Sequence, residues 1–168
     1  MNCKLVVYLL LTLSVIGCQK DQKATSLTAA KIERKHSCRI DGMIVADYGG
    51  PKSQFINKQG ERSFFCDTKE IFELILNPIQ GRKIEQAWFQ TFETSTTDDA
   101  TLTWQKPDSL FFVGGSDFKG VMGPTFAVFK TEGVAREFAQ NRGGKVYRFH
   151  EINTEIYREI TAQGMNSF

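Results

Sequence analysis

Hydrophobic residues in this chain gather in short runs, which glycine, proline and polar turns separate. Six of these runs predict short strands: Gln54–Ile56, Ser63–Cys66, Ile84–Thr94, Ser109–Gly114, Thr125–Phe129 and Val146–Phe149. A further strand is expected at Ile44–Ala46, just before the Gly49-Gly50-Pro51 turn. Apolar residues at helical spacing predict three helices, after Asp67, after Thr131 and around Ile156–Ile160.

The first two predicted helices have recognisable starts and ends. Asp67 and Glu70 have the spacing of a capping box, and Thr131 is a suitable cap for the second helix. Asn77-Pro78 is expected to end the first helix, and Gly143-Gly144 the second.

A weak internal repeat accompanies this pattern. A glycine-bearing turn, a strand and a capped helix occur in residues 49–76 and again in residues 114–142. The spacing differs between the two copies, so periodicity alone does not establish a duplication. The elements predict an α+β fold with mostly antiparallel short strands.

The first eighteen residues have the pattern of an export signal. Lys4 is their only charge, and Leu5–Ile16 is almost wholly apolar. This run is too short for a stable membrane-spanning helix, which needs about 20 residues. It ends in Val15-Ile16-Gly17-Cys18, which resembles a bacterial lipobox. We expect residues 1–17 to be a signal peptide and Cys18 to be acylated; an ordinary signal peptide with a chance cysteine is the alternative.

Acylation at Cys18 would anchor the protein to a membrane without spanning it. Residues 18–35 are polar and are expected to act as a tether. Gln19 differs from the acidic residue that often retains lipoproteins at the inner membrane. An exported protein on the periplasmic side is therefore expected, at the outer membrane if the source is Gram-negative.

Composition narrows the classes of function. The 168 residues suit one compact domain or two small lobes, and 41% hydrophobic with 24% charged residues argues against disorder. The net charge of +2, from 21 Lys+Arg against 19 Asp+Glu, gives no case for a nucleic-acid partner. Only two histidines occur, which rules out a His-rich metal site.

Common enzyme motifs are missing from the sequence. It has no Gly-x-Ser-x-Gly, phosphate loop or dinucleotide fingerprint. A Cys–His nucleophile from Cys38 or Cys66 with His36 or His150 lacks a family signature. A structural zinc site would need all four of these side chains to meet. We therefore expect a protein that is not an enzyme.

A soft metal fits the remaining donors better. Cu(I) prefers thiolate and thioether ligands. His36, Cys38, Asp41 and Met43 lie within eight residues, and Gly42 allows a sharp turn beside Met43. Met122 lies far away in sequence, beside another glycine in a predicted tight turn. These residues form a Cu(I) site if the two turns converge.

Simpler interpretations of the same residues stay open. Both methionines could fill the core, which is the usual role of methionine beside an apolar strand. After signal removal Cys38 and Cys66 are the remaining thiols, and in an oxidising compartment they could form a disulfide. His36 lies in a polar stretch, where solvation alone would explain it.

A family resemblance favours the metal-binding interpretation. The sequence resembles the NosL family of nitrous oxide reductase accessory lipoproteins over roughly residues 36–152. The matching motifs, in order, are the lipobox at Cys18, the Cys38–Met43 segment, Phe64–Asp67 before a helix, Thr103-Trp104, Ser109–Gly115, Val121–Gly123 and Gly143–Val146. No single motif is decisive, but their order and spacing together are specific.

The resemblance implies a periplasmic Cu(I)-binding chaperone that supplies nitrous oxide reductase and its membrane-bound maturation complex. It also implies two small related lobes, similar to the metal-site domain of organomercurial lyase. These would be residues 36–80 and 81–152, followed by a C-terminal helix and tail at 153–168.

The resemblance also implies a ligand set. Cys38, Met43 and Met122 carry over from the family motifs as metal ligands, with Asp41 as a ligand or loop-orienting residue. Many members have a histidine where this chain has Pro124, so copper is bound here without that imidazole or with His36 supplying a nitrogen. The alternatives are another soft metal, or an interaction module with a structural Cys38–Cys66 disulfide and no metal.

Overall fold

A computed structural model describes residues 27–95 and 102–162. The predicted signal peptide, Cys18 and the first part of the predicted tether lie outside the described residues, as do most of the loop after Ser95 and the chain end after Ala162. None of the described helices has the length and apolar character that crossing a bilayer requires.

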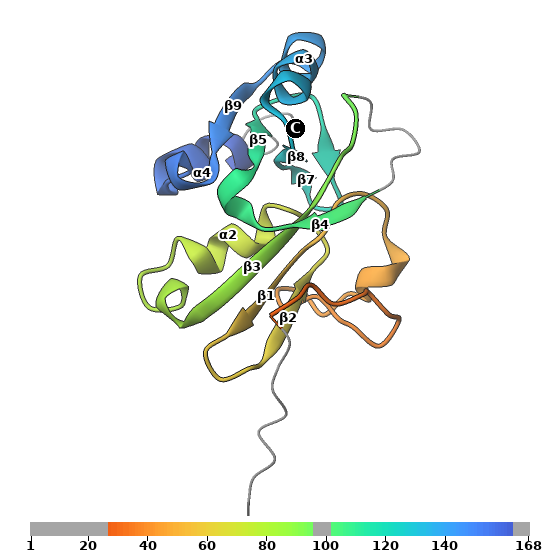
Figure 1. Cartoon of the computed structure of the whole chain (residues 1–168), viewed down its shortest axis with the longest axis vertical. Helices are drawn as coiled ribbons and strands as arrows, with labels where there is room; N and C mark the ends of the chain where they lie inside the picture. The colour runs from red at the N-terminus through yellow and green to blue at the C-terminus, as the bar shows by residue number, and fades with distance from the viewer. Residues whose placement is uncertain (1–26, 96–101, 163–168) are drawn as a thin grey trace, which may run out of the picture.

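Two antiparallel sheets, one above the other in Figure 1, form the framework of the described chain. The lower sheet has the order β2-β1-β3-β4, with β1 at Ser53–Asn57, β2 at Arg62–Phe65, β3 at Ile84–Thr91 and β4 at Thr103–Gln105. The upper sheet has the order β8-β5-β9, with β5 at Phe111–Gly114, β8 at Ala127–Phe129 and β9 at Lys145–Arg148. A two-stranded hairpin of β6 (Lys119–Gly120) and β7 (Gly123–Pro124) lies between β5 and β8 in the chain.

Three α-helices and four short 3-10 helices complete the described chain. The α-helices are α2 (Glu70–Ile75), α3 (Glu132–Arg142) and α4 (Thr154–Ala162). The 3-10 helices are η1 (Val45–Asp47), η2 (Gly81–Lys83), η3 (Pro107–Ser109) and η4 (Phe149–Glu151). The α+β class expected from the sequence is confirmed.

The two sheets repeat one topology. In the lower lobe β1 pairs antiparallel with β2 on one side and β3 on the other, and α2 connects β2 to β3. In the upper lobe β5 pairs antiparallel with β8 and β9, and α3 connects β8 to β9. Each lobe is thus a β-β-α-β unit with its first strand in the centre, which gives the weak sequence repeat a structural counterpart.

The division between these units differs from the boundary expected after residue 80. Strands β3 and β4 belong to the lower sheet, where β3 pairs with β1 and β4 pairs with β3. The lobes therefore divide between β4 and β5. A parallel bridge from Phe92 to Phe129, with the Phe92 amide donating to the Val128 carbonyl at 2.8 Å, also connects them.

One local prediction fails, and another is shifted by one residue. Ile44–Ala46 is not a strand: Ile44 makes a single antiparallel bridge to Ser37, and the chain then turns into η1. Only Val45 of this run is buried, so its other apolar residues do not build a sheet face. The tight turn expected at Met122–Pro124 is the turn of a small hairpin and lies at Val121-Met122, because Gly123 and Pro124 pair with β6. Gly123 has a φ of +89°.

The second half of the expected tether lies against the lower sheet. The Ala30 amide and carbonyl pair with the side chain of Gln54, at 2.9 and 3.0 Å, and the Thr28 carbonyl accepts from Arg62 at 2.8 Å. Gln54 is fully buried by these contacts. A free tether would therefore be restricted to residues before Thr28.

Aromatic side chains from both lobes share one core. Phe72 of α2 contacts the rings of Phe89 in the lower lobe, Phe112 and Phe126 in the upper lobe, and Phe149 of η4, at centroid distances of 5.2–5.8 Å. Phe72 itself has no exposed surface. Because its neighbours come from both sheets, the two lobes cannot separate without exposing this core.

Replacing Phe72 tests whether the lobes unfold together. We expect Phe72→Ala to lower the free energy of unfolding by about 3–5 kcal/mol, because it leaves a cavity between the lobes. Ile79→Ala, at a 64% exposed site after the same helix, should change it by less than about 0.5 kcal/mol. Chemical denaturation followed by tryptophan fluorescence and circular dichroism measures both. Two separate transitions in the parent protein would contradict a shared core.

Candidate metal centre

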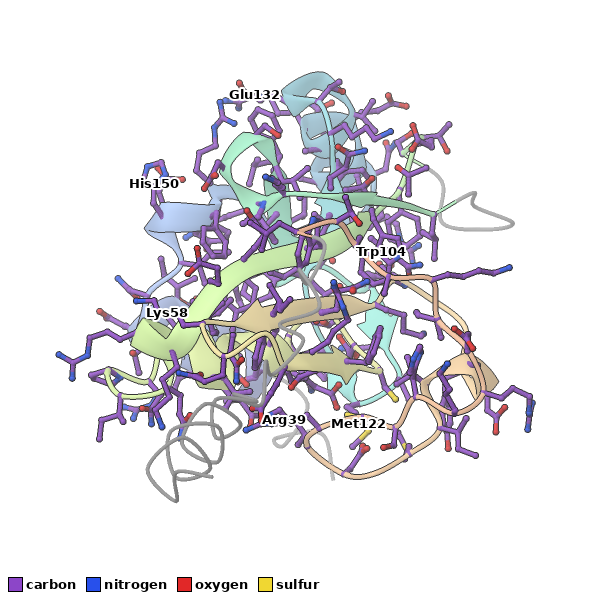
Figure 2. All side chains as sticks on the ribbon, turned by 60° about the horizontal axis from the view of Figure 1, so that its bottom comes forward. Arg39, Lys58, Trp104, Met122, Glu132 and His150 are labelled. Carbon is purple, nitrogen blue, oxygen red and sulfur yellow. The ribbon has the colours of Figure 1, made fainter. Side chains whose placement is uncertain are left out.

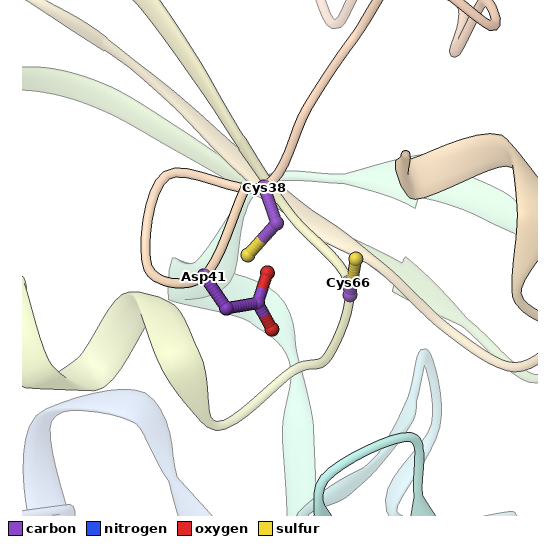
Figure 3. Close-up of side chains that lie close together, drawn as sticks. All are labelled: Cys38, Asp41 and Cys66. Atoms are coloured by element: carbon purple, nitrogen blue, oxygen red, sulfur yellow. The ribbon is translucent and has the colours of Figure 1, made fainter. Parts of the chain in front are cut away.

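Three side chains from two segments bring donor atoms together at one edge of the lower lobe. The Cys38 thiol, the Asp41 carboxylate and the Cys66 thiol each offer an atom that lies within 4.8 Å of the other two. Figure 3 shows Cys38 and Asp41 on one loop and Cys66 facing them from the end of β2. It is the one such cluster of Cys, His, Asp and Glu donors found in residues 27–95 and 102–162.

Residues Cys38–Met43, here called the thiol loop, fold back on themselves through backbone hydrogen bonds. The Cys38 amide donates to the Met43 carbonyl at 2.7 Å, and the Gly42 amide donates to the Cys38 carbonyl at 2.9 Å. Gly42 has a φ of +79°, a conformation that residues with a Cβ rarely adopt. Asp41 stabilises the turn by accepting the Met43 amide at 2.9 Å. The sharp turn expected beside Met43 is confirmed.

Cys66 reaches the thiol loop because the loop pairs with β2. Cys38 forms a parallel bridge with Phe64, and the Arg39 amide donates to the Phe64 carbonyl at 2.9 Å. Both thiols are buried in a small apolar cluster with Val45 and Phe64, against which Met43 packs. Met43 thus lies beside the thiols and is partly buried there.

Both cysteines are free thiols in the structure. Burial raises the pKa of Cys66 from its ordinary value near 9 to about 12, and the Cys38 thiol and nearby carboxylates add to this effect. Burial also raises the pKa of Cys38, although the amide of Ile40 donates to its sulfur at 3.4 Å. Without a metal, both side chains are therefore protonated at neutral pH.

Glu70 is a further carboxylate at this centre, and it is only 2% exposed. Its Oε2 accepts from the Cys38 thiol at 3.4 Å and from the Asp67 amide at 3.0 Å. Its Oε1 is buried and has no hydrogen-bond partner among the described residues. Burial raises the pKa of this carboxyl group. The sequence placed Glu70 in a capping box with Asp67, and the structure contains one half of it, the bond from the Asp67 amide to Glu70. Helix α2 begins at Glu70, and the Asp67 carboxylate accepts the amide of Lys69 instead of that of Glu70. No spacing rule connects Glu70 to Cys38.

The buried ammonium group of Lys52 offsets part of the negative charge of the nearby carboxylates. Lys52 is 3% exposed, and its ammonium group donates to the carbonyls of Gly49 and Gly50. It interacts electrostatically with Cys66, Asp67 and Glu70, while burial lowers its pKa. A positive charge near Cys66 favours the thiolate form that a metal requires.

Met122 is held at the same centre through its backbone. Its amide donates to Asp67 Oδ2 at 3.3 Å, and its carbonyl accepts from the Lys69 ammonium group. Its side chain is 46% exposed, so Met122 does not fill the core. In Figure 2 it lies on the same side of the molecule as Arg39 of the thiol loop and far from His150.

His36 lies outside the donor cluster. Its ring stacks on Phe64, with centroids 4.0 Å apart and an interplanar angle of 15°. Its Nδ1 accepts the Glu33 amide at 3.0 Å, and burial lowers its pKa. The side chain has a local structural role in these contacts.

The arrangement offers two kinds of donor. Two thiols and the thioether of Met43 are soft ligands gathered in a largely apolar environment, whereas Asp41 supplies a hard oxygen. Soft donors in low number suit Cu(I) better than an ion that requires several oxygen ligands. From the sequence, Cys66 was considered as a nucleophile with a histidine or as a disulfide partner of Cys38, and it was not among the expected copper ligands.

Comparisons with known proteins find similar sequences over most of the chain. A family model described as NosL matches residues 29–157. The copper-binding lipoprotein NosL of Stutzerimonas stutzeri is 31% identical over 162 residues, which cover 91% of this chain and 81% of that protein.

Solved structures are similar as well. The crystal structure of the copper chaperone NosL from Shewanella denitrificans matches with a TM-score of 0.68 and 28% identity, over 76% of this chain and 97% of that one. The solution structure of apo-NosL from Achromobacter cycloclastes matches with a TM-score of 0.48 and 21% identity, over 63% and 88% of the two chains.

The raised pKa of Cys66 predicts a pH dependence of stability in the metal-free protein. The folded chain holds the Cys66 proton more tightly than the unfolded chain, so this stabilisation is complete below about pH 9 and is lost as the pH rises toward about 12. Between about pH 9 and pH 12, the free energy of unfolding of Cys66→Ser should therefore decrease less than that of the parent protein. Denaturant titrations of both proteins from pH 8 to pH 11 measure the difference, and parallel curves would contradict the prediction.

Proposed function

Because the chain belongs to the NosL family, we propose that it binds Cu(I) and carries it to proteins that assemble a copper enzyme, nitrous oxide reductase. The observation that supports this most directly is the convergence of Cys38 and Cys66, two buried thiols, with the Asp41 carboxylate. Thiolate sulfur is the donor that Cu(I) prefers. The protein acts as a carrier rather than as an enzyme.

In this proposal Cys38 and Cys66 are the main ligands. Met43 supports the assignment because it packs against the cluster that contains both thiols. Met122 supplies a second thioether from the opposite lobe, and its exposed side chain can move toward the thiols when copper arrives. Asp41 orients the thiol loop through its bond to the Met43 amide.

Loading requires that protons leave the site. Because burial keeps both thiols protonated, each thiolate that binds Cu(I) releases one proton, and the affinity for Cu(I) increases with pH. The buried Lys52 ammonium group offsets the negative charge that the thiolates introduce. Copper reaches the thiols from the side where Asp41 and Met122 are exposed.

The cellular setting is part of the proposal. The lipobox at Val15–Cys18 supports anchoring of the exported protein to a membrane through a lipid on Cys18. The partners are nitrous oxide reductase and its membrane-bound maturation complex, on the periplasmic side, and the outer membrane is favoured in a Gram-negative cell. A surface-anchored carrier needs an accessible site so that it can release its metal.

A Cu(I) titration tests the metal and the ligands together. We expect one Cu(I) per chain under anaerobic conditions, measured by competition with a Cu(I) chelator. Cys38→Ser and Cys66→Ser should each weaken binding by about a hundredfold or more, since each removes a thiolate. Met43→Leu and Met122→Leu should each weaken it by about tenfold, while changing stability by less than about 1.5 kcal/mol.

The matched control for the methionines is Ile40→Leu, which alters an exposed apolar residue of the same loop without removing a donor. Its Cu(I) affinity should equal that of the parent. If the Cys38→Ser protein bound Cu(I) as tightly as the parent, the proposed site would be wrong. A Cys38–Cys66 disulfide in protein that is competent to bind copper, detected by thiol alkylation and intact mass, would favour an interaction module instead.

The lipid anchor is tested separately. Cys18→Ala should abolish fatty-acid labelling in cells and leave the signal peptide uncleaved by the lipoprotein peptidase, because the acylated thiol is missing. Cys3→Ala, which changes a cysteine inside the predicted signal, is the control and should be processed normally. Normal acyl labelling of Cys18→Ala would contradict anchoring at this residue.

A further inference from the structure

We propose that Asp67 is a positioning residue of the metal site, whose carboxylate holds the Met122 turn of the upper lobe against the thiols of the lower lobe. This inference rests on the proposed function, because it concerns how one of the proposed ligands is placed. Asp67 directly follows Cys66 in the chain and is 1% exposed.

The two carboxylate oxygens of Asp67 contact different segments. Oδ1 accepts the Lys69 amide at 3.2 Å at the start of α2, and it also accepts the hydroxyl of Thr125. Oδ2 accepts the Met122 amide at 3.3 Å. Residues Lys119–Pro124 are here called the methionine hairpin. The Asp67 side chain bonds both to Met122 and to Thr125, the residue after this hairpin, and the Lys69 ammonium group adds a second contact to the Met122 carbonyl.

Steric fit points to the same contact. A Cβ atom on Gly120 would overlap the Asp67 carboxylate. The glycine therefore allows the methionine hairpin to pass directly over Asp67, and any larger residue would push the hairpin or the carboxylate away. Since Gly120 pairs with Gly123 across the hairpin, a shift at this point would also move Met122.

Asp67 is also bonded on its other side to the residues that hold the thiols. Its amide donates to Glu70 Oε2, which accepts from the Cys38 thiol at 3.4 Å. Its carbonyl accepts the hydroxyl of Ser53 at 2.9 Å, which fixes the chain beside Cys66 to strand β1. One residue therefore connects the thiol loop, the end of β2 and the methionine hairpin.

A helix cap alone would explain only the bond to Lys69. Asparagine is as good a cap as aspartate, so Asp67→Asn keeps that function. The single acceptor oxygen of asparagine keeps the most bonds in the place of Oδ1, where it accepts from both the Lys69 amide and the Thr125 hydroxyl. Its NH₂ group then faces the Met122 amide, which is also a donor, and the bond to Met122 is lost. The substitution therefore separates positioning of Met122 from capping of α2.

The experiment is a double-mutant cycle on Cu(I) affinity, with Asp67→Asn and Met122→Leu made singly and together in the full domain. Asp67→Asn should weaken Cu(I) binding by up to about tenfold, the loss expected for Met122→Leu, because it acts through that ligand. In the Asp67→Asn background, Met122→Leu should add less than about a twofold loss, because the thioether is no longer held at the site. Asp108→Asn, at an exposed position, is the control and should bind like the parent.

Thr125 gives a second test if Asp67→Asn does not fold, as judged by its thermal unfolding. Thr125→Val removes the hydroxyl that donates to Asp67 and should weaken Cu(I) binding by about fivefold or more, whereas Thr125→Ser keeps the donor and should restore it. An equal effect of Met122→Leu in both backgrounds would overturn the inference, and so would parental affinity in Asp67→Asn. The weaker Cu(I) binding expected for Cys38→Ser does not depend on Asp67. If Asp67 proves to have no positioning role, the proposed copper site is therefore still supported.

Discussion

The packing of Phe72 between the two lobes is the contact on which the rest of the site depends. Its ring is enclosed by Phe112 and Phe126 of the upper lobe and Phe89 of the lower lobe, and these contacts fix helix α2 at the junction. Close packing leaves a side chain of this size little freedom to shift. Because α2 cannot rotate, the residues at its start project toward the thiol loop, and the metal site forms where the lobes meet.

The buried polar groups at this junction lower the stability of the folded state. Glu70 is buried with one oxygen that has no partner among the described residues, and Lys52 is buried with a lowered pKa. A core made only of apolar side chains would avoid both desolvation penalties. Such local conflicts are expected at functional sites, where the surrounding fold compensates for them. In this protein the aromatic core supplies that compensation, and the polar groups give the two thiols an environment in which a metal can replace their protons.

Structural features that depend on residues close together in the chain were predictable from the sequence. The strands around Phe55, Phe64 and Phe112, the Asp67–Glu70 pair and the turn at Gly42 follow from alternation, capping spacing and the conformational freedom of glycine. The predictions that failed concern segments whose structure depends on residues far away in the sequence. The run at Ile44 does not form a strand because no neighbouring strand covers it, and β4 was missed because its three residues are defined only by their pairing with β3. Cys66 joined the site for the same reason, since only the bridge between Cys38 and Phe64 brings the two thiols together.

The repeated topology separates the scaffold from the parts that carry function. Each lobe has a central strand, two antiparallel neighbours and one helix, yet the donors do not occupy equivalent positions in the two units. The thiol loop precedes the first strand of the lower lobe, whereas the methionine hairpin is inserted between the first two strands of the upper lobe. In the lower lobe the same two strands are joined by a short turn at residues 58–61, which contributes no donor to the cluster. Cys66 is the donor that the repeat itself supplies, from the end of β2, whereas the thiol loop and the methionine hairpin are additions to the scaffold. Asp67, the next residue after Cys66, bonds to the methionine hairpin and so connects the added segment to the repeated unit.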